Sequence, residues 1–358
     1  MKLLQIYEKV ERMVQRLPET LQRPILREIT PIKTLFLLQR PPRVALLGER
    51  SASRADLLNG IFRSEVDQES SEIIHDGMWQ AITLHARGTL RLFDARRPVA
   101  FSIAQAALTS EEPDLFILVR KATAQKTFEA DLKHAAQLLE FFDLRQTARA
   151  RIIALQLNGD IDDCATLRRM IGEQPALAAR LAAVLPYAGT ASQAANLIEV
   201  IAAEVPEETR LETARLSGNR KLQLDLAGTV VKSVTAICGA VGTQPIPLAD
   251  FPILTSLQVS MVAGIMHISG REMSARLAAE FVGAIGANIG AGLVLREGAR
   301  AVLKFVPVWG DVLAGAIAAG GTYAIGRAAT AYFIEGASLK DARTLFRKRP
   351  RQPPLLKS

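Results

Sequence analysis

Short apolar segments alternate with helix-like segments between residues 43 and 187, and this alternation restricts the folds open to the chain. Strands are predicted at 43–48, 79–87, 89–94, 114–120, 151–157 and 184–187. Helices are predicted between most of them, at 55–61, 98–108, 127–142 and 164–185, the last broken near Pro175. The pattern indicates βαβ crossovers, and Gly88 suggests a hairpin. We therefore predict a mainly parallel sheet with one antiparallel edge strand.

The composition changes after a connecting helix predicted over 206–226. From Leu226 to Gly336 there are seven Lys/Arg and six Asp/Glu in 111 residues, and glycine and alanine recur throughout. Small residues of this kind permit close approach of helices. We expect an all-α, Gly/Ala-rich hydrophobic domain, buried either as a tightly packed soluble bundle or against lipid, in the membrane plane, as a hairpin or spanning.

The length of 358 residues exceeds that of an ordinary single core. We divide the chain into an N-terminal helical lead-in (1–40), an α/β domain (41–205), a hydrophobic helical domain (206–336) and a basic C-terminal tail (337–358). The first 14 residues carry several charges within a helical apolar pattern, which is not typical of a secretory signal.

The net charge of +8 is concentrated in the tail, where 340–358 holds seven Lys/Arg and one Asp. Arg347, Lys348, Arg349 and Arg351 are the candidate contacts to anionic lipid headgroups, and a solvated end without a ligand is the alternative. Nucleic acid is not expected as a partner, because no aromatic-rich basic surface accompanies the charge. The two cysteines lack ligand-like spacing, which favours a reducing cytoplasm and no metal site.

The segment after the first strand lies where a phosphate-binding loop with the pattern GxxxxGK[ST] would be. Of that pattern only Gly48 is present, because Ser53, Arg54 and Ala55 occupy the glycine, lysine and hydroxyl positions. A Cβ at Ser53 disfavours glycine-like backbone, and the guanidinium of Arg54 is larger than an ammonium. Ala55 has no hydroxyl to ligate magnesium.

The same loop has the S-x-x-D spacing of a helix capping box, from Ser53 to Asp56. With Ser53 as N-cap and Asp56 in the first turn, the helix would satisfy part of its own free amides and dipole. We therefore predict that the carboxylate of Asp56 stands in for a phosphate at this helix N-terminus.

Two later strand ends carry altered forms of other nucleotide-binding motifs. A DxxG motif becomes Asp94 followed by Arg97, and an NKxD motif becomes Asn158 and Asp160 without the lysine. We interpret Asp94 as a structural carboxylate bonded to neighbouring amides or to Arg54, in preference to a magnesium ligand. The segment from Asn158 is either a relic of base recognition or a simple polar turn.

The chain resembles bacterial Era-like GTPases that carry a C-terminal hydrophobic domain of uncharacterised function. The segments that carry the resemblance are Gln39–Gly48, Leu57–Phe62, Pro245–Thr255, Phe305–Gly310 and Tyr323–Ala329. The resemblance implies a P-loop GTPase-like α/β domain, GTP binding and a membrane-linked role. The sequence departs from the motifs of that family at Ser53, Arg54, Ala55, Arg97 and Gly159.

We therefore expect a GTPase-like regulatory or scaffolding protein with a degenerate nucleotide site that does not hydrolyse GTP. It would bind another protein, either another GTPase-like subunit or a second copy of itself, at the cytoplasmic face of a bacterial inner membrane. No catalytic residue, metal or cofactor is expected. The alternatives are a GTPase with an unconventional loop, which would bind GTP or GDP with magnesium, and a soluble interaction scaffold.

Overall fold

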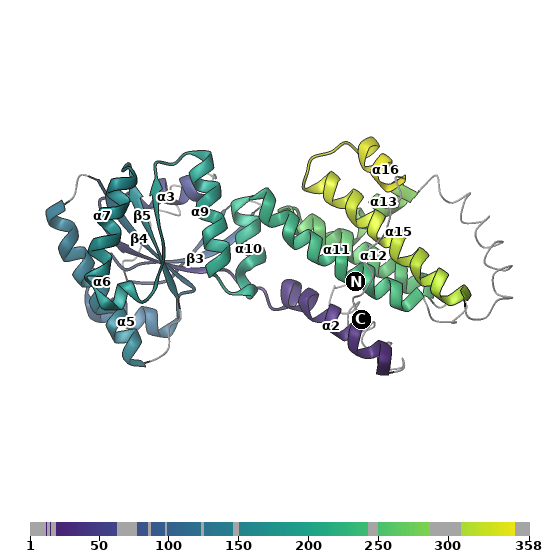
Figure 1. Ribbon diagram of the computed structural model, residues 1–358, viewed down its shortest axis with the longest axis horizontal. Helices are drawn as coiled ribbons and strands as arrows, with labels where there is room; N and C mark the ends of the chain where they lie inside the picture. Colours follow the sequence, from purple (N-terminus) through teal and green to yellow (C-terminus); the bar gives the residue numbers. More distant parts are fainter. Residues whose placement is uncertain are drawn as a thin grey trace. The chain divides into compact units, whose positions relative to one another are not determined.

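The computed structural model describes residues 12, 15, 19–62, 77–84, 87–96, 99–122, 125–145, 150–242, 250–286 and 309–347. The chain forms two compact units, a sheet unit of residues 39–219 and a helical unit made of residues 1–38 and 220–358. The predicted tail residues Lys348, Arg349 and Arg351 lie outside the described residues, as does Arg97. Figure 1 shows the elements of both units.

The sheet unit contains a six-stranded sheet in the order β2-β3-β1-β4-β5-β6. Its strands are β1 (Arg43–Gly48), β2 (Gln80–Leu84), β3 (Gly88–Asp94), β4 (Leu115–Lys121), β5 (Arg151–Leu157) and β6 (Leu181–Tyr187). β2 pairs antiparallel with β3, and all other neighbours are parallel. The predicted mainly parallel sheet with one antiparallel edge is therefore confirmed.

Helices cover both faces of the sheet (Figure 1). They are α3 (Arg54–Phe62), α5 (Phe101–Ser110), α6 (Gln125–Arg145), α7 (Ile161–Gly172), α8 (Pro175–Ala178), α9 (Ala191–Glu204) and α10 (Glu207–Ser217). Successive strand residues point to opposite faces. One core therefore joins alternate residues of the strands to α5, α6, α7 and α8, and the other joins the remaining residues to α3, α9 and α10.

Two predicted helices differ from the observed elements. The helix predicted at 164–185 ends earlier, because the chain from Leu181 pairs with β5 instead, and the sheet edge overrides the helical propensity of its alanines. The helix predicted at 206–226 is two helices, since Gly218 ends α10 in the left-handed conformation at φ 60°.

The boundary between the units falls after Asn219 and not at the predicted 205/206 position. α10 belongs to the sheet unit because it packs on β3 and α9. The first residues of this unit also lie beside α10, near its end. The Arg40 N–H donates to the Glu208 carbonyl at 3.0 Å, and the Leu211 N–H donates to Gln39 Oε1 at 3.2 Å.

In its described part the second unit is helical. It comprises α2 (Glu19–Leu37), α11 (Arg220–Gly242), α12 (Asp250–Ile268), α13 (Ala275–Gly286), α15 (Trp309–Phe333) and α16 (Leu339–Arg347). α11 packs against α2, α12 and α15. At Gly326 of α15 an added Cβ would lie 2.7 Å from Val231 and 3.1 Å from Met261, so this glycine permits the predicted close helix approach.

Among the described residues one helix, α11, is long and apolar enough to cross a membrane by length and composition. Its apolar window is 56% buried against the other helices of the unit. Ala227, Val230, Val234, Ile237 and Cys238 are all fully buried. These contacts make α11 the central helix of the bundle in this structure.

Candidate functional site

The loop that joins β1 to α3 (residues 49–53, the β1–α3 loop) lies at the carboxyl edge of the sheet. β1 leads into α3 on one face, whereas its neighbours β3 and β4 lead into α5 and α6 on the other face. In open parallel sheets, ligands bind outside the carboxyl ends of strands at such a switch point. The candidate site is therefore this loop together with the ends of β3 and β4.

The side chain of Arg96, just after β3, is bound into the β1–α3 loop. Its Nη1 donates to the carbonyl oxygens of Glu49 (3.0 Å) and Ala52 (2.7 Å). Its Nε and Nη2 donate to the two carboxylate oxygens of Asp94 at 2.8 and 2.7 Å. The Arg96 side chain is only 2% exposed and that of Asp94 is 9% exposed. The pair is therefore a buried bidentate ion pair, the strongest common geometry for these groups.

A second set of contacts holds the other side of the loop. The buried carboxylate of Glu49 accepts from the backbone N–H of Lys121 at 2.9 Å and from the hydroxyl of Ser51. Lys121 Nζ donates to the Ser51 carbonyl at 2.7 Å. A phosphate-binding loop presents its N–H groups to an anion. Here three loop carbonyls, those of Glu49, Ser51 and Ala52, instead accept from cationic side chains.

The pKa of Asp94 reflects this environment. Burial raises it, but the hydrogen bonds and charge of Arg96 outweigh burial, with help from the charge of Arg54, so the net pKa lies below its usual value. The Arg96 backbone N–H also donates to Asp94 at 3.2 Å. A neighbouring amide thus bonds Asp94, as the interpretation of a structural carboxylate expects, and the choice of this role over magnesium ligation stays an interpretation. Its side-chain partner is Arg96, and the charge of Arg54 also lowers its pKa.

Ser53 forms the predicted N-cap of α3. Its Oγ accepts from the Asp56 N–H at 3.2 Å, and its carbonyl accepts from the Leu57 N–H at 3.1 Å. Asp56 lies in the first turn of α3, where its charge meets the positive end of the helix dipole. Arg54 and Ala55 are the first two residues of the same helix. The cap half of the predicted box is present, and the substitution of Asp56 for a phosphate stays a prediction.

The segment after β5 forms a capped turn. Asn158 has a φ of 51°, a conformation that asparagine tolerates better than most residues, and its N–H donates to the Tyr187 carbonyl at 3.0 Å. Asp160 caps α7 through a full capping box with Asp163. The carboxylate of Asp160 is therefore engaged in capping, which favours the polar-turn reading of this segment.

Sequence reasoning missed Arg96, Glu49 and Lys121 as components of this site. The spacing of Arg96, two residues after a strand-ending aspartate, was the one signal for its ion pair. Its contacts to the loop join residues 44 and 47 positions apart and left no local pattern. Among the described residues, no group of three or more His, Cys, Asp or Glu side chains is placed to hold a metal ion.

Comparison with models of known protein families finds no match to this chain, and none of the curated proteins matches it.

Proposed function

We propose that this protein is a GTPase-like regulatory or scaffolding module that does not hydrolyse GTP. In place of a phosphate, side chains of the protein itself bind its β1–α3 loop. The sheet order, with an antiparallel β2 at the edge and a loop-to-helix connection after β1, supports a P-loop GTPase-like unit. The altered motif positions Ser53, Arg54 and Ala55 support the loss of hydrolysis.

The observation that carries the proposal is the position of the Arg96 guanidinium. It donates to two carbonyls of the β1–α3 loop and to both oxygens of Asp94, the residue that would assist magnesium in an active site. A nucleotide with magnesium would need this loop to turn its amides inward and Asp94 to release Arg96. Leaving one partner of a buried ion pair uncompensated costs about 3–5 kcal/mol, so release of Arg96 would weaken nucleotide binding unless the bound phosphate and magnesium compensate both charges.

Calorimetric titration of the purified protein with GTP and GDP, with and without magnesium, tests the proposal. We expect no heat of binding and no turnover for the wild-type protein. The Arg96→Met variant is the informative comparison, because it frees the loop carbonyls and Asp94 together. Micromolar binding by the wild type with measurable GTP hydrolysis would overturn the proposal in favour of a GTPase with an unconventional loop.

The proposal includes a protein partner, either a second GTPase-like subunit or a second copy of this chain. Large apolar side chains are exposed near the β2 edge and the start of α5: Met78 is 62% exposed, Ile103 is 48% and Phe101 is 37%. A Cβ added at Gly77 would lie 2.3 Å from Ile103, so these two segments adjoin. Exposed apolar groups that cluster in this way favour an interaction surface over solvent.

Association with the cytoplasmic face of a membrane is the last part of the proposal. Arg347 ends α16, whose exposed residues include Lys340 and Arg343, and it precedes four further basic residues in the sequence. Neutralising Arg347, Lys348, Arg349 and Arg351 should weaken binding to anionic vesicles by about 1 kcal/mol per charge. Vesicle sedimentation at two salt concentrations measures this. Binding that is unchanged by the substitutions would contradict it and favour a soluble scaffold.

A further inference from the structure

A pocket of about 490 Å³ lies between α6, α7 and the end of β4, on the face of the sheet opposite to α3. Its volume is in the range of small-molecule sites in proteins. Five of its lining side chains are charged, namely Arg120, Glu129, Lys133, Arg169 and Glu173. Nothing in the β1–α3 loop site uses this pocket, so it needs an explanation of its own.

Arg120 is the buried charge of this pocket, with 1% of its surface exposed. Its Nη1 donates to Gln156 Oε1 at 2.9 Å, and its guanidinium carbon lies 5.7 Å from the centre of the Phe128 ring. In the described part of the chain its Nε has no hydrogen-bond partner, and neither has Nε2 of the fully buried Gln156. No carboxylate among the described residues forms an ion pair with Arg120.

The other charges of the pocket come as two pairs at helical spacing. Glu129 and Lys133 are four residues apart on α6, and Arg169 and Glu173 are four residues apart at the end of α7. Opposite charges at this spacing are neighbours on a helix surface and offset each other. Arg120 therefore supplies the one excess positive charge, at the buried end of the pocket.

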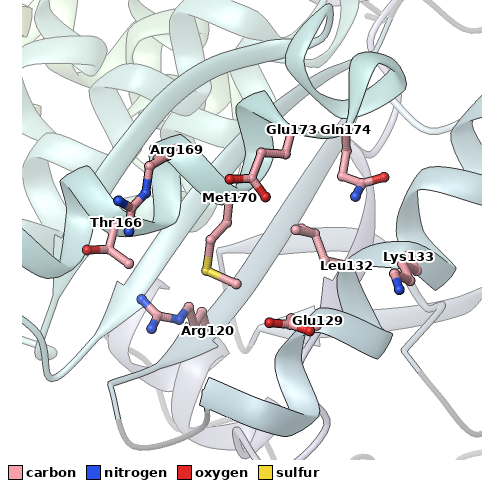
Figure 2. A pocket seen from close by; sticks show the side chains of 9 residues that line it. All are labelled: Arg120, Glu129, Leu132, Lys133, Thr166, Arg169, Met170, Glu173 and Gln174. Carbon is pink, nitrogen blue, oxygen red and sulfur yellow. The ribbon is translucent and has the colours of Figure 1, made fainter.

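Figure 2 shows how these groups are oriented. The guanidinium groups of Arg120 and Arg169 both point toward the end of the pocket that carries Thr166, whereas Glu129 and Lys133 lie on the opposite side. Met170 lies between the two ends. Two guanidinium groups and a hydroxyl can donate several hydrogen bonds to one oxyanion.

We propose that this pocket binds a small molecule through a single carboxylate or phosphate group held by Arg120, Arg169 and Thr166. A buried guanidinium without a charged partner is unfavourable on its own, and an oxyanion in the pocket would supply the missing charge. The carboxylate of Glu129 on the opposite side, together with that of Glu173 in the lining, disfavours a second anionic group. The site therefore selects a molecule with one anionic end over a polyphosphate such as a nucleoside triphosphate.

Thermal melting of the full chain with millimolar inorganic phosphate, glycerol phosphate, lactate or succinate tests this inference, with sodium chloride at equal ionic strength as the reference. A ligand that binds only the folded state raises the melting temperature with its concentration. We expect glycerol phosphate or lactate, each with one anionic group, to do so, and succinate, which has two carboxylates, to do so less. Calorimetry with the active probe separates the phosphate from the carboxylate class. The absence of stabilisation by every probe with one anionic group would overturn the inference.

Two variants on neighbouring positions of α7 provide a matched control. Arg169→Gln should weaken binding of the active probe about tenfold or more, because it removes charged hydrogen bonds. Arg168→Gln should leave binding unchanged, because Arg168 is exposed and does not line the pocket. Equal binding by the two variants would refute the assignment. Arg120→Met should abolish binding while leaving GTP and GDP titrations as in the wild type, which separates this site from the proposed nucleotide-loop function.

Discussion

Arg96 follows β3 and Arg120 lies near the end of β4, so both are at the carboxyl edge of the same sheet, on either side of β1. Both are almost completely buried. Arg96 has a bidentate carboxylate and two carbonyl acceptors within the protein. Arg120 has one amide oxygen and the face of a phenyl ring. The first guanidinium is satisfied by the chain itself, whereas the second lines a pocket and its Nε has no hydrogen-bond partner in the described part of the chain.

This difference separates a group that stabilises the fold from a group that is available to a ligand. A buried cation whose hydrogen bonds are made within the protein holds the segments around it together. Arg96 does this for the β1–α3 loop. A buried cation with incomplete partners lowers stability unless something else supplies the acceptor. Burial alone therefore does not identify a binding residue, and the proposal for Arg120 rests on burial together with an unused donor and an adjoining pocket.

The largest expected effect is a difference in stability between variants of the two arginines. Arg96→Met should destabilise the protein by about 3–5 kcal/mol, because it leaves Asp94 and two carbonyls without their partner. Arg120→Met should cost clearly less, since no charge is left behind. Urea unfolding measures both, with Arg151→Met as the control for an exposed, weakly paired arginine. Similar losses of unfolding free energy in Arg96→Met and Arg120→Met would show that the two arginines do not differ in this way.

The pH dependence of stability sharpens the assignment of the Arg96 pair. Because the pKa of Asp94 is lowered in the folded state, its contribution is fully present above the pKa that the group has in the unfolded chain. It is lost as the pH falls through the lower, folded-state value. We expect Asp94→Asn to flatten the acid limb of a stability curve measured by urea unfolding. An acid limb as steep as that of the wild type would show that Asp94 is not strongly paired.

Features of the fold and the site could be predicted from the sequence where the residues in contact are close together in the chain. β1 and β5 were predicted with their observed ends, because each is an apolar run with a charged residue before it and turn-forming residues after it. Ser53 was predicted as a cap because its partner, the Asp56 N–H, is three residues away. Interactions within one turn leave a pattern in the chain.

Longer-range features left no such pattern. The start of β6 at Leu181 depends on the free edge of β5, which competes with the helical propensity of the alanines before it. The pocket at Arg120 depends on α6 and α7, whose positions follow from packing on the sheet. An arginine within an apolar strand, as in Leu115–Lys121, was the visible sign of that site, but its neighbours could be identified only in three dimensions.

A smaller effect is expected at the cap that holds the loop next to Arg96. Ser53→Ala should lower the unfolding free energy by about 1 kcal/mol. Asp56→Ala should lower it by a few tenths to about 1 kcal/mol through the helix dipole. Thermal or urea unfolding checks both. A melting temperature that is unchanged in Asp56→Ala would contradict the idea that this carboxylate replaces an anion at the helix end.

The smallest expected effect is the outcome of rebuilding the loop sequence. The triple variant Ser53→Gly, Arg54→Lys and Ala55→Ser should gain no GTPase activity, because Arg96 would still bind the loop carbonyls and Asp94. Adding Arg96→Met to the triple variant should allow nucleotide binding that calorimetry can detect. Robust hydrolysis by the triple variant alone would show that Arg96 is displaced readily, and its buried pair would then resemble the loosely partnered Arg120.

The helical unit consists of two segments that are far apart in the sequence, so the ribosome synthesises its parts at different times. α2 packs against α11, with the Ser233 hydroxyl donating to Glu28 at 2.8 Å, yet the 181 residues from 39 to 219 separate the two segments of this unit. At typical synthesis rates of about 5–20 residues per second, α2 leaves the ribosome roughly 10–40 s before its partner. The sheet unit can fold during that interval. The apolar face of α2, which includes Ile25, Ile29 and Ile32, remains exposed until α11 is made. A nascent chain stalled before residue 220 should therefore be the form of this protein most dependent on chaperones.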